Sequence, residues 1–282
     1  MPKASDKLTN LHSRFLDQQG AEWCQQYRDV CHKRQATLAS LHKRGILTVS
    51  DLAARFSELP TRLKQRALDL ILILRIRQMI PVLQANLPDV SVRLMCAHVL
   101  GSLGLNSRGM RLFLEIGQRE LRASHPDAEW LQAVVLALGM SSDRRVTELL
   151  VAIFERQDLP GPLRGEAGDK LGTCRFDRRT NAYRRCRDAA LIGLTADSID
   201  VQFWSMYVIA SLSNIAGSRQ RVDKSFRAAL PRLREIAAHD HRRAPGFWWP
   251  LSAEAEDAIG CIENGIWPEP DAADRWPVMR DG

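Results

Sequence analysis

The segment at residues 89–104 constrains the fold more than any other part of the chain. It reads Asp-Val-Ser-Val-Arg-Leu-Met-Cys-Ala-His-Val-Leu-Gly-Ser-Leu-Gly, and its pattern recurs further along. When Leu100 and Gly101 are aligned with residues 138–139 and then 171–172, Cys96 and Ala97 align with small or apolar pairs. The offsets of 38 and 33 residues are typical of arrays of helical hairpins. Because a hairpin of this kind buries its apolar flanks only against neighbouring hairpins, the sequence predicts a stacked, elongated array.

A fourth copy begins at Asp200-Val201, which repeats Asp89-Val90. Turn formers and helix stops divide the chain into short helical segments, and no segment alternates with a period of two, so no sheet is expected. Beyond residue 60, helices are predicted at 63–74, 79–86, from 89 onward, 110–122, 127–138, 146–156, 163–171, 181–194, 201–214, 226–238 and 253–264. We expect a helical N-terminal cap at 1–59, a repeat region at 60–265 and an acidic, tryptophan-containing tail at 266–282.

Two parts of this pattern resemble HEAT repeats. The segment 89–104 is similar to the second helix of such a repeat, and Ile80-Pro81-Val82-Leu83 resembles its first helix with the internal proline. The resemblance covers about residues 60–265 and implies an all-α, armadillo-like α-solenoid of about five to six hairpins between helical caps. Most members of this family are binding scaffolds, and only a few branches are enzymes. The copy at 160–172 departs from the pattern with Pro162 and with three glycines besides Gly172, which indicates a bent or loosely packed unit.

The stacking of helical pairs favours structural roles, rather than ligand contact, for two charged residues of the first copy. Asp89 is expected to cap the following helix, since an aspartate before a helix can accept its free N–H groups. Arg93, four positions later, is expected to reach a carboxylate of the adjacent repeat.

Composition and cysteine usage favour a cytoplasmic protein. The apolar runs are far shorter than the roughly 20 residues of a membrane span, and no secretory signal follows Met1. The six cysteines include no Cys-x-x-Cys pair, which indicates reduced thiols rather than disulfides.

The residues that carry common chemistries are missing or scattered. No histidine is followed by glutamate, as the di-iron enzymes of the HEAT class would require. We interpret His239-Asp240-His241 as a polar loop rather than a metal site, and Glu254, Glu256 and Asp257 as charges near a helix start. No nucleophile motif and no phosphate-binding loop occurs. We therefore predict a protein that is not an enzyme and holds neither a metal nor a cofactor.

The prediction that remains is a scaffold or adaptor that binds a partner protein in the concave groove. In such arrays the second helices line the groove, and their outward positions here are polar to acidic, which suits a neutral or basic partner. Two adjacent tryptophans near the C-terminus add a candidate anchor, although we favour the interpretation that this segment folds over the last repeat as a cap. The predicted partner-binding residues are Ser91, His98, Glu129, Gln132, Glu166, Asp169, Gln202, Ser205, Trp248 and Trp249.

Two alternatives stay open. Residues 164–243 carry a net charge of +7 and residues 244–282 a net charge of −6. The basic stretch could bind nucleic acid on the convex side, as a DNA-glycosylase-type protein would, because phosphate binding needs several cations along one track. The chain could also be a subunit of a larger assembly or a toxin-neutralising, immunity-type protein. The sequence does not determine its oligomeric state.

Overall fold

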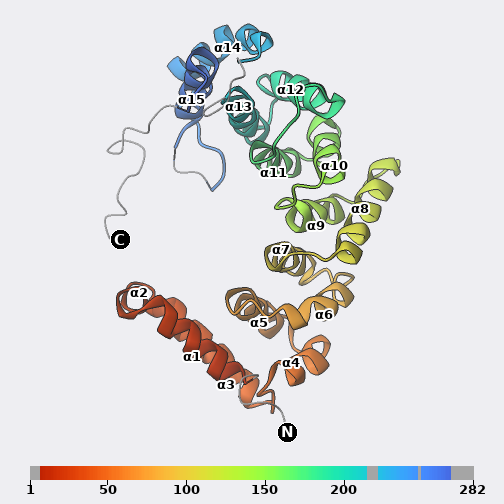
Figure 1. Ribbon diagram of the computed structural model, residues 1–282, viewed down its shortest axis with the longest axis vertical. Helices are drawn as coiled ribbons and strands as arrows, with labels where there is room; N and C mark the ends of the chain where they lie inside the picture. The colour runs from red at the N-terminus through yellow and green to blue at the C-terminus, as the bar shows by residue number, and fades with distance from the viewer. Residues whose placement is uncertain (1–6, 215–221, 247–248, 268–282) are drawn as a thin grey trace. The chain divides into compact units, whose positions relative to one another are not determined.

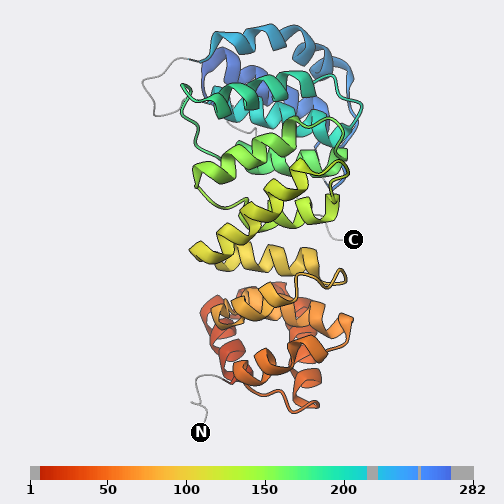
Figure 2. The same cartoon turned by 90° about the vertical axis from the view of Figure 1, so that its right-hand side faces the viewer.

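A computed structural model describes residues 7–214, 222–246 and 249–267, and all structural statements below concern these residues (Figures 1 and 2). The predicted all-α class is confirmed: helices α1 to α15 account for the regular structure, and the one extended pairing in the described part of the chain is an isolated bridge between Lys7 and Thr48. None of the described helices is long and apolar enough to cross a membrane.

The chain divides into two compact units. The first contains residues 1–113 and 136–140, and the second contains residues 114–135 and 141–282. The first unit includes α1 (Leu8–Gln19), α2 (Ala21–Gln26), α3 (Arg28–His42), α4 (Val49–Arg55), η2 (Phe56–Glu58), α5 (Thr61–Ile73), η3 (Arg77–Met79), α6 (Ile80–Ala85), α7 (Arg93–Leu103) and the start of α8 (Ser107–Arg122).

Apolar side chains spaced three or four residues apart build the core of the first unit. Helix α5 packs on α3 and α7, and α6 packs on α7. The side chains of Leu68 and Ile71 of α5 are fully buried, as is Phe56 before it. Helix α4 begins with a capping box, in which the Thr48 hydroxyl accepts the Asp51 N–H and the Asp51 carboxylate accepts the Thr48 N–H. Such a box provides acceptors for free N–H groups at the start of the helix.

The second unit stacks helical pairs. It contains most of α9 (Ala128–Leu138), then α10 (Arg144–Glu155), α11 (Gly161–Gly172), α12 (Asn181–Gly193), α13 (Ile199–Ser213), η4 (Lys224–Ala229), α14 (Leu230–His239) and α15 (Leu251–Asn264). Within each pair, α10 contacts α11, α12 contacts α13 and α14 contacts α15. Between pairs, α11 contacts α13 and α13 contacts α15, so the second helices of successive pairs form a continuous layer.

The aligned copies share their buried positions. The corresponding core residues are Cys96, Ala97 and Leu100 in α7, Val134, Val135 and Leu138 in α9, and Ala167, Gly168 and Leu171 in α11. All of them are buried, so the alignment of these three copies places equivalent residues in equivalent environments.

The aligned arginines also share one contact. Arg93 is buried at the start of α7, and its Nε donates to the carbonyl oxygen of Leu87 at 3.0 Å. Arg164 is buried near the start of α11, and its Nε donates to the carbonyl oxygen of Phe154 at 3.0 Å. In both cases a buried guanidinium satisfies a carbonyl of the preceding helix or turn, which would be costly to leave without a partner.

The expected role of Asp89 as a helix cap is wrong. Val92 occupies the N-cap position of α7 and offers no side-chain cap. The Asp89 carboxylate instead accepts the Lys64 Nζ at 2.8 Å, and the Ser91 N–H at 3.1 Å. The contact between neighbouring helical segments is therefore an ion pair made by Lys64, while Arg93 donates to a main-chain carbonyl.

The expectation of a bent or loosely packed unit at 160–172 is also wrong. Helix α11 is continuous from Gly161 to Gly172, and Pro162 lies in its first turn, where a missing N–H costs nothing. Gly165 and Gly168 are buried. A methyl group at Gly168 would lie 2.9 Å from the Trp204 Cβ, so the glycines allow close packing against α13.

Candidate protein-binding surface

Helix α13 exposes one narrow stripe. After the first turn, every residue from Val201 to Ser213 is buried except Trp204, Tyr207 and Ser211, which are half-exposed. Their spacing of three and four residues places them on one side of the helix, in line with Asp200. Two large aromatic rings therefore occupy the open side of a helix that is otherwise buried.

These rings lie against the glycines of α11. A methyl group added at Gly165 would lie 2.8 Å from the Trp204 Cδ1, and one added at Gly172 would lie 2.1 Å from the Tyr207 Cε1. Both distances are shorter than any ordinary carbon contact, so the rings occupy the space that a side chain would fill. The glycines of α11 fix where the two rings lie.

The rings continue into an aromatic cluster. Trp204 and Tyr207 meet edge to face, with centroids 5.3 Å apart and an interplanar angle of 83°. Tyr207 meets Trp267, which follows α15, at 5.7 Å and 63°. Edge-to-face contacts of this kind stabilise an aromatic cluster beyond the area it buries. Tyr207 is thus held between two tryptophans while its own side chain stays half-exposed.

Carboxylates border the rings. Glu166 and Asp169 lie three residues apart on α11, both half-exposed, and the Gln132 Nε2 of α9 donates to the Glu166 Oε2 at 3.2 Å. Asp169 pairs with Lys170 at 2.5 Å. The pKa of Tyr207 is raised, first by burial and then by the negative charges of Asp169 and Glu254, so the phenol stays neutral at physiological pH. We call the surface formed by Gln132, Glu166, Asp169, Trp204, Tyr207 and Trp267 the acidic–aromatic surface.

The structure brings part of the predicted binding set together. Gln132, Glu166 and Asp169 belong to the acidic–aromatic surface, and Glu129 lies one turn before Gln132 on α9 and is half-exposed. All four side chains are thus accessible to solvent in part, and their role in binding a partner stays a prediction.

Two predicted residues belong to the first unit. His98 is exposed on α7, as expected for an outward position. Ser91 is exposed in the turn before α7, where its hydroxyl donates to the Asp89 carboxylate at 2.6 Å and lies 3.4 Å from the Thr61 hydroxyl.

The predicted outward orientation of Gln202 and Ser205 is wrong. Both side chains are buried, and Ser205 is fully inaccessible. The Gln202 Nε2 donates to the carbonyl oxygen of Ala196 at 2.5 Å, and its Oε1 accepts Arg242 at 3.1 Å. Gln202 thus makes the contact that Arg93 and Arg164 make in their copies, and it belongs to the buried side of α13.

Of the two adjacent tryptophans, Trp248 lies outside the described residues. Trp249 is half-buried, its ring contacts Phe203 at 5.8 Å, and its Nε1 donates to the Glu254 carboxylate at 2.9 Å. The Glu254 side chain is itself buried. Trp249 therefore joins the start of α15 to α13, which agrees with the capping role that the sequence left open.

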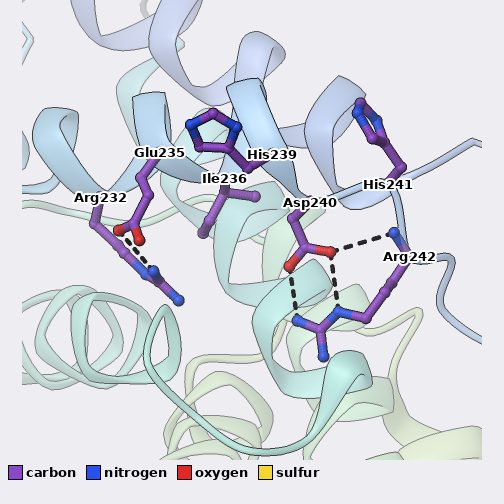
Figure 3. A pocket seen from close by; sticks show the side chains of 7 residues that line it. All are labelled: Arg232, Glu235, Ile236, His239, Asp240, His241 and Arg242. Atoms are coloured by element: carbon purple, nitrogen blue, oxygen red, sulfur yellow. Dashed lines mark hydrogen bonds and ion pairs between the residues drawn. The ribbon is translucent and has the colours of Figure 1, made fainter.

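The loop at His239-Asp240-His241 lines a pocket of about 590 Å³ (Figure 3). The Asp240 carboxylate accepts both Nε and Nη2 of Arg242, at 2.9 and 2.6 Å, and these contacts lower its pKa. Figure 3 shows this carboxylate turned toward Arg242, with the two imidazole rings apart from each other. Within the described ranges no three metal-binding side chains gather at one place.

The arginines of the first helices are largely matched by nearby carboxylates. The ion pairs in the second unit join Arg144 to Glu148, Arg145 to Asp143, Arg185 to Glu155, Arg187 to Asp188, Arg232 to Glu235 and Arg234 to Glu263. A paired arginine contributes less to the potential that attracts a phosphate backbone. These ion pairs therefore count against the binding of nucleic acid by the first helices.

Sequence reasoning did not assign Trp204, Tyr207 and Trp267 to the site. The signal that could have found the first two is the glycine spacing at 165, 168 and 172, which marks one side of α11 as a place of close approach.

Comparisons of the chain with protein-family models, with curated proteins and with solved structures found no match.

Proposed function

We propose that this chain is a non-catalytic protein-binding scaffold, and that it holds a segment of a partner protein on the acidic–aromatic surface. The observation that carries the proposal is the stripe on α13, where Trp204 and Tyr207 stay half-exposed although the rest of the helix is buried. Tryptophan, tyrosine and arginine dominate the energetics of protein interfaces. For the two aromatic residues, the reason is that covering a large ring removes much apolar surface from water.

The arrangement of the second unit supports a solenoid of HEAT-like hairpins as the scaffold. Each pair contacts the next through its second helix, from α11 to α13 to α15. In an array of this type the second helices line the concave side, so α11 and α13 would present the surface toward an extended partner segment. The proposal places the protein in the cytoplasm, as its cysteine usage favours.

A subunit of an assembly and a toxin-neutralising protein would use the same surface, so both are forms of this proposal. They differ only in the identity of the partner.

The test is affinity capture from the native cell with a charge-reversed surface. The variant carries Glu129→Lys, Glu166→Lys and Asp169→Lys, which reverse the carboxylates that border the rings while leaving the rings in place. We expect the wild-type chain to retain a stoichiometric partner and the variant to lose it, because like charges across an interface are strongly unfavourable.

The matched control reverses three exposed carboxylates elsewhere, with Glu22→Lys, Glu115→Lys and Asp197→Lys. It has the same net charge as the first variant. Both variants should show the wild-type circular dichroism spectrum and melting temperature within about 2 °C. Equal recovery of the partner by both variants would show that the partner binds elsewhere.

A further inference from the structure

The open positions on the second helices of the second unit carry an excess of negative charge. Between residues 128 and 135 of α9 and along α11 and α13, the half-exposed or exposed charged residues are four carboxylates and one ammonium: Glu129, Glu166, Asp169, Asp200 and Lys170. The whole chain has a net charge of +7. The negative charge on this surface is therefore a local feature that opposes the overall charge.

Aromatic faces lie within this negative region. Trp204 is held over Gly165 and Gly168, and Tyr207 is held over Gly172. The edge-to-face contact between the two rings leaves their planes nearly perpendicular, at 83°. The π face of a tryptophan or tyrosine attracts a cation electrostatically, and a nearby carboxylate adds to that attraction.

Fixed rings and neighbouring carboxylates together match the side chain of arginine. A guanidinium stacks on an aromatic face and at the same time donates paired N–H groups to a carboxylate. Lysine offers the same charge without the planar fork, so it would bind more weakly at such a place.

Building on the proposed function, we propose that the partner segment bound by the acidic–aromatic surface is basic, and that it places an arginine side chain against Trp204 and Tyr207 within reach of Glu166 and Asp169. An acidic segment would meet four carboxylates, and a phosphate backbone would meet the same repulsion. The charge of the surface therefore favours a basic partner segment over an acidic one.

The test uses model peptides and isothermal titration calorimetry with the full chain at low ionic strength. Hexa-arginine is the probe. Hexa-lysine tests whether the planar guanidinium group is needed, and hexa-glutamate and a short DNA duplex test whether a negatively charged ligand binds. We expect hexa-arginine to bind, hexa-lysine to bind roughly threefold or more weakly, and the two anionic probes to show no heat that depends on this surface. Because the chain is basic overall, a basic peptide gains nothing from the net charge.

Two variants locate the peptide. Glu166→Lys with Asp169→Lys should weaken hexa-arginine binding by roughly tenfold or more, whereas the control Glu115→Lys with Asp197→Lys, of equal net charge, should change it by less than about twofold. Trp204→Phe keeps a ring over the α11 glycines and should weaken binding roughly threefold, because phenylalanine attracts cations less than tryptophan.

Each alternative occupant has its own outcome. Equal losses in the two charge variants, or tighter binding of the DNA duplex than of hexa-arginine, would overturn the proposal. Self-association that disappears in the Glu166→Lys, Asp169→Lys variant would make a second copy of the chain the occupant and would overturn it as well. If no basic peptide binds while partner capture still depends on the carboxylates, this inference fails and the proposed function stands. If hexa-arginine binds as expected but capture is unaffected, the proposed function fails.

Discussion

Replacing Gly101 by alanine tests the close approach of α7 to the end of α9. A methyl group at this position would lie 2.6 Å from the carbonyl oxygen of Leu136 and 2.8 Å from that of Ala137. These atoms belong to the backbone of a helix and cannot rotate away as a side-chain end can. The shorter distance falls about 0.8 Å below the 3.4 Å at which ordinary contacts begin, so the helices must separate.

Two opposing effects decide the sign of the change in stability. In an isolated helix, alanine for glycine would stabilise by about 1 kcal/mol. Forcing a methyl group into a packed interface costs about 1–3 kcal/mol, and here the separation also loosens the contacts of Leu100 and Leu138, both buried. Because the obstacle is backbone, we place the packing cost at the upper end of that range. The net expectation is destabilisation by about 1–2 kcal/mol.

Urea denaturation followed by circular dichroism at 222 nm measures this difference. With a denaturant slope of about 2–3 kcal/mol/M, the midpoint should fall by roughly 0.5 M. The matched control is Ser102→Ala, which changes the neighbouring and half-exposed residue of the same helix and should stabilise by about half a kcal/mol. If Gly101→Ala unfolds at the same or a higher urea concentration than wild type, the close packing of α7 on α9 is not as described.

Further predictions concern buried charge and thiols in the first unit. His12 is buried, and its pKa is lowered mainly by this burial and to a smaller extent by the charge of Arg34. The stability that is present above pH 6.5 should therefore be lost as the pH falls through the lowered pKa. His12→Gln should flatten that part of a curve of stability against pH. The Lys64 ammonium, and then the Ser91 hydroxyl, lower the pKa of Asp89 to about 2, so the contribution of this pair should persist to about pH 4 and fall below it. Because the Asp89 side chain is partly exposed, which screens the pair, Lys64→Ala should destabilise by roughly 1 kcal/mol in urea titrations at pH 7. Burial raises the pKa of Cys96 to about 12, so iodoacetamide at pH 8 should label it only after unfolding, as peptide mass spectrometry would show.

The fold class and much of the repeat pattern were predictable because burial repeats along the chain. The alignment of Leu100 with residues 138 and 171 correctly equates core positions in α7, α9 and α11. Equivalent leucines and small residues face neighbouring helices in each copy, and this periodicity is visible in the sequence. The division of the chain into two units had no such signal, since it falls within α8 and α9 rather than at a turn.

The register of the fourth copy was not predictable from the Asp-Val pair alone. Matching Asp200 to Asp89 pairs residue 204 with Arg93, whereas the buried contacts pair Gln202 with Arg93. A shift of two residues rotates a helix face by about 200°. This rotation explains why Gln202 and Ser205 were expected to face outward and are buried instead. An aspartate near a helix start can occupy several positions of the turn, so it sets the register poorly.

The corrected register makes the chemistry of the surface clearer. An offset of 38 residues pairs Arg164 with Gln202, and the same offset pairs Glu166 with Trp204 and Asp169 with Tyr207. The open positions of α11 are therefore carboxylates where those of α13 are aromatic. Some buried positions differ in size as well, because Gly165 and Gly168 of α11 correspond to Phe203 and Met206 of α13.

The glycines of α11 give a physical reason to regard this difference as functional. Gly165, Gly168 and Gly172 each destabilise the helix by about 1 kcal/mol relative to alanine. The space that alanine methyl groups would need is occupied by Trp204 and Asp200 at Gly165, by the Trp204 Cβ and Phe154 at Gly168, and by the Tyr207 ring at Gly172. At Gly172 the three nearest atoms all belong to the Tyr207 ring, so a smaller residue at position 207 would allow an alanine there. The Tyr207 ring nevertheless remains half-exposed and buries only part of its area. A fold selected for stability alone would favour that alanine, and the proposed contact with a partner would account for the exposed part of the ring.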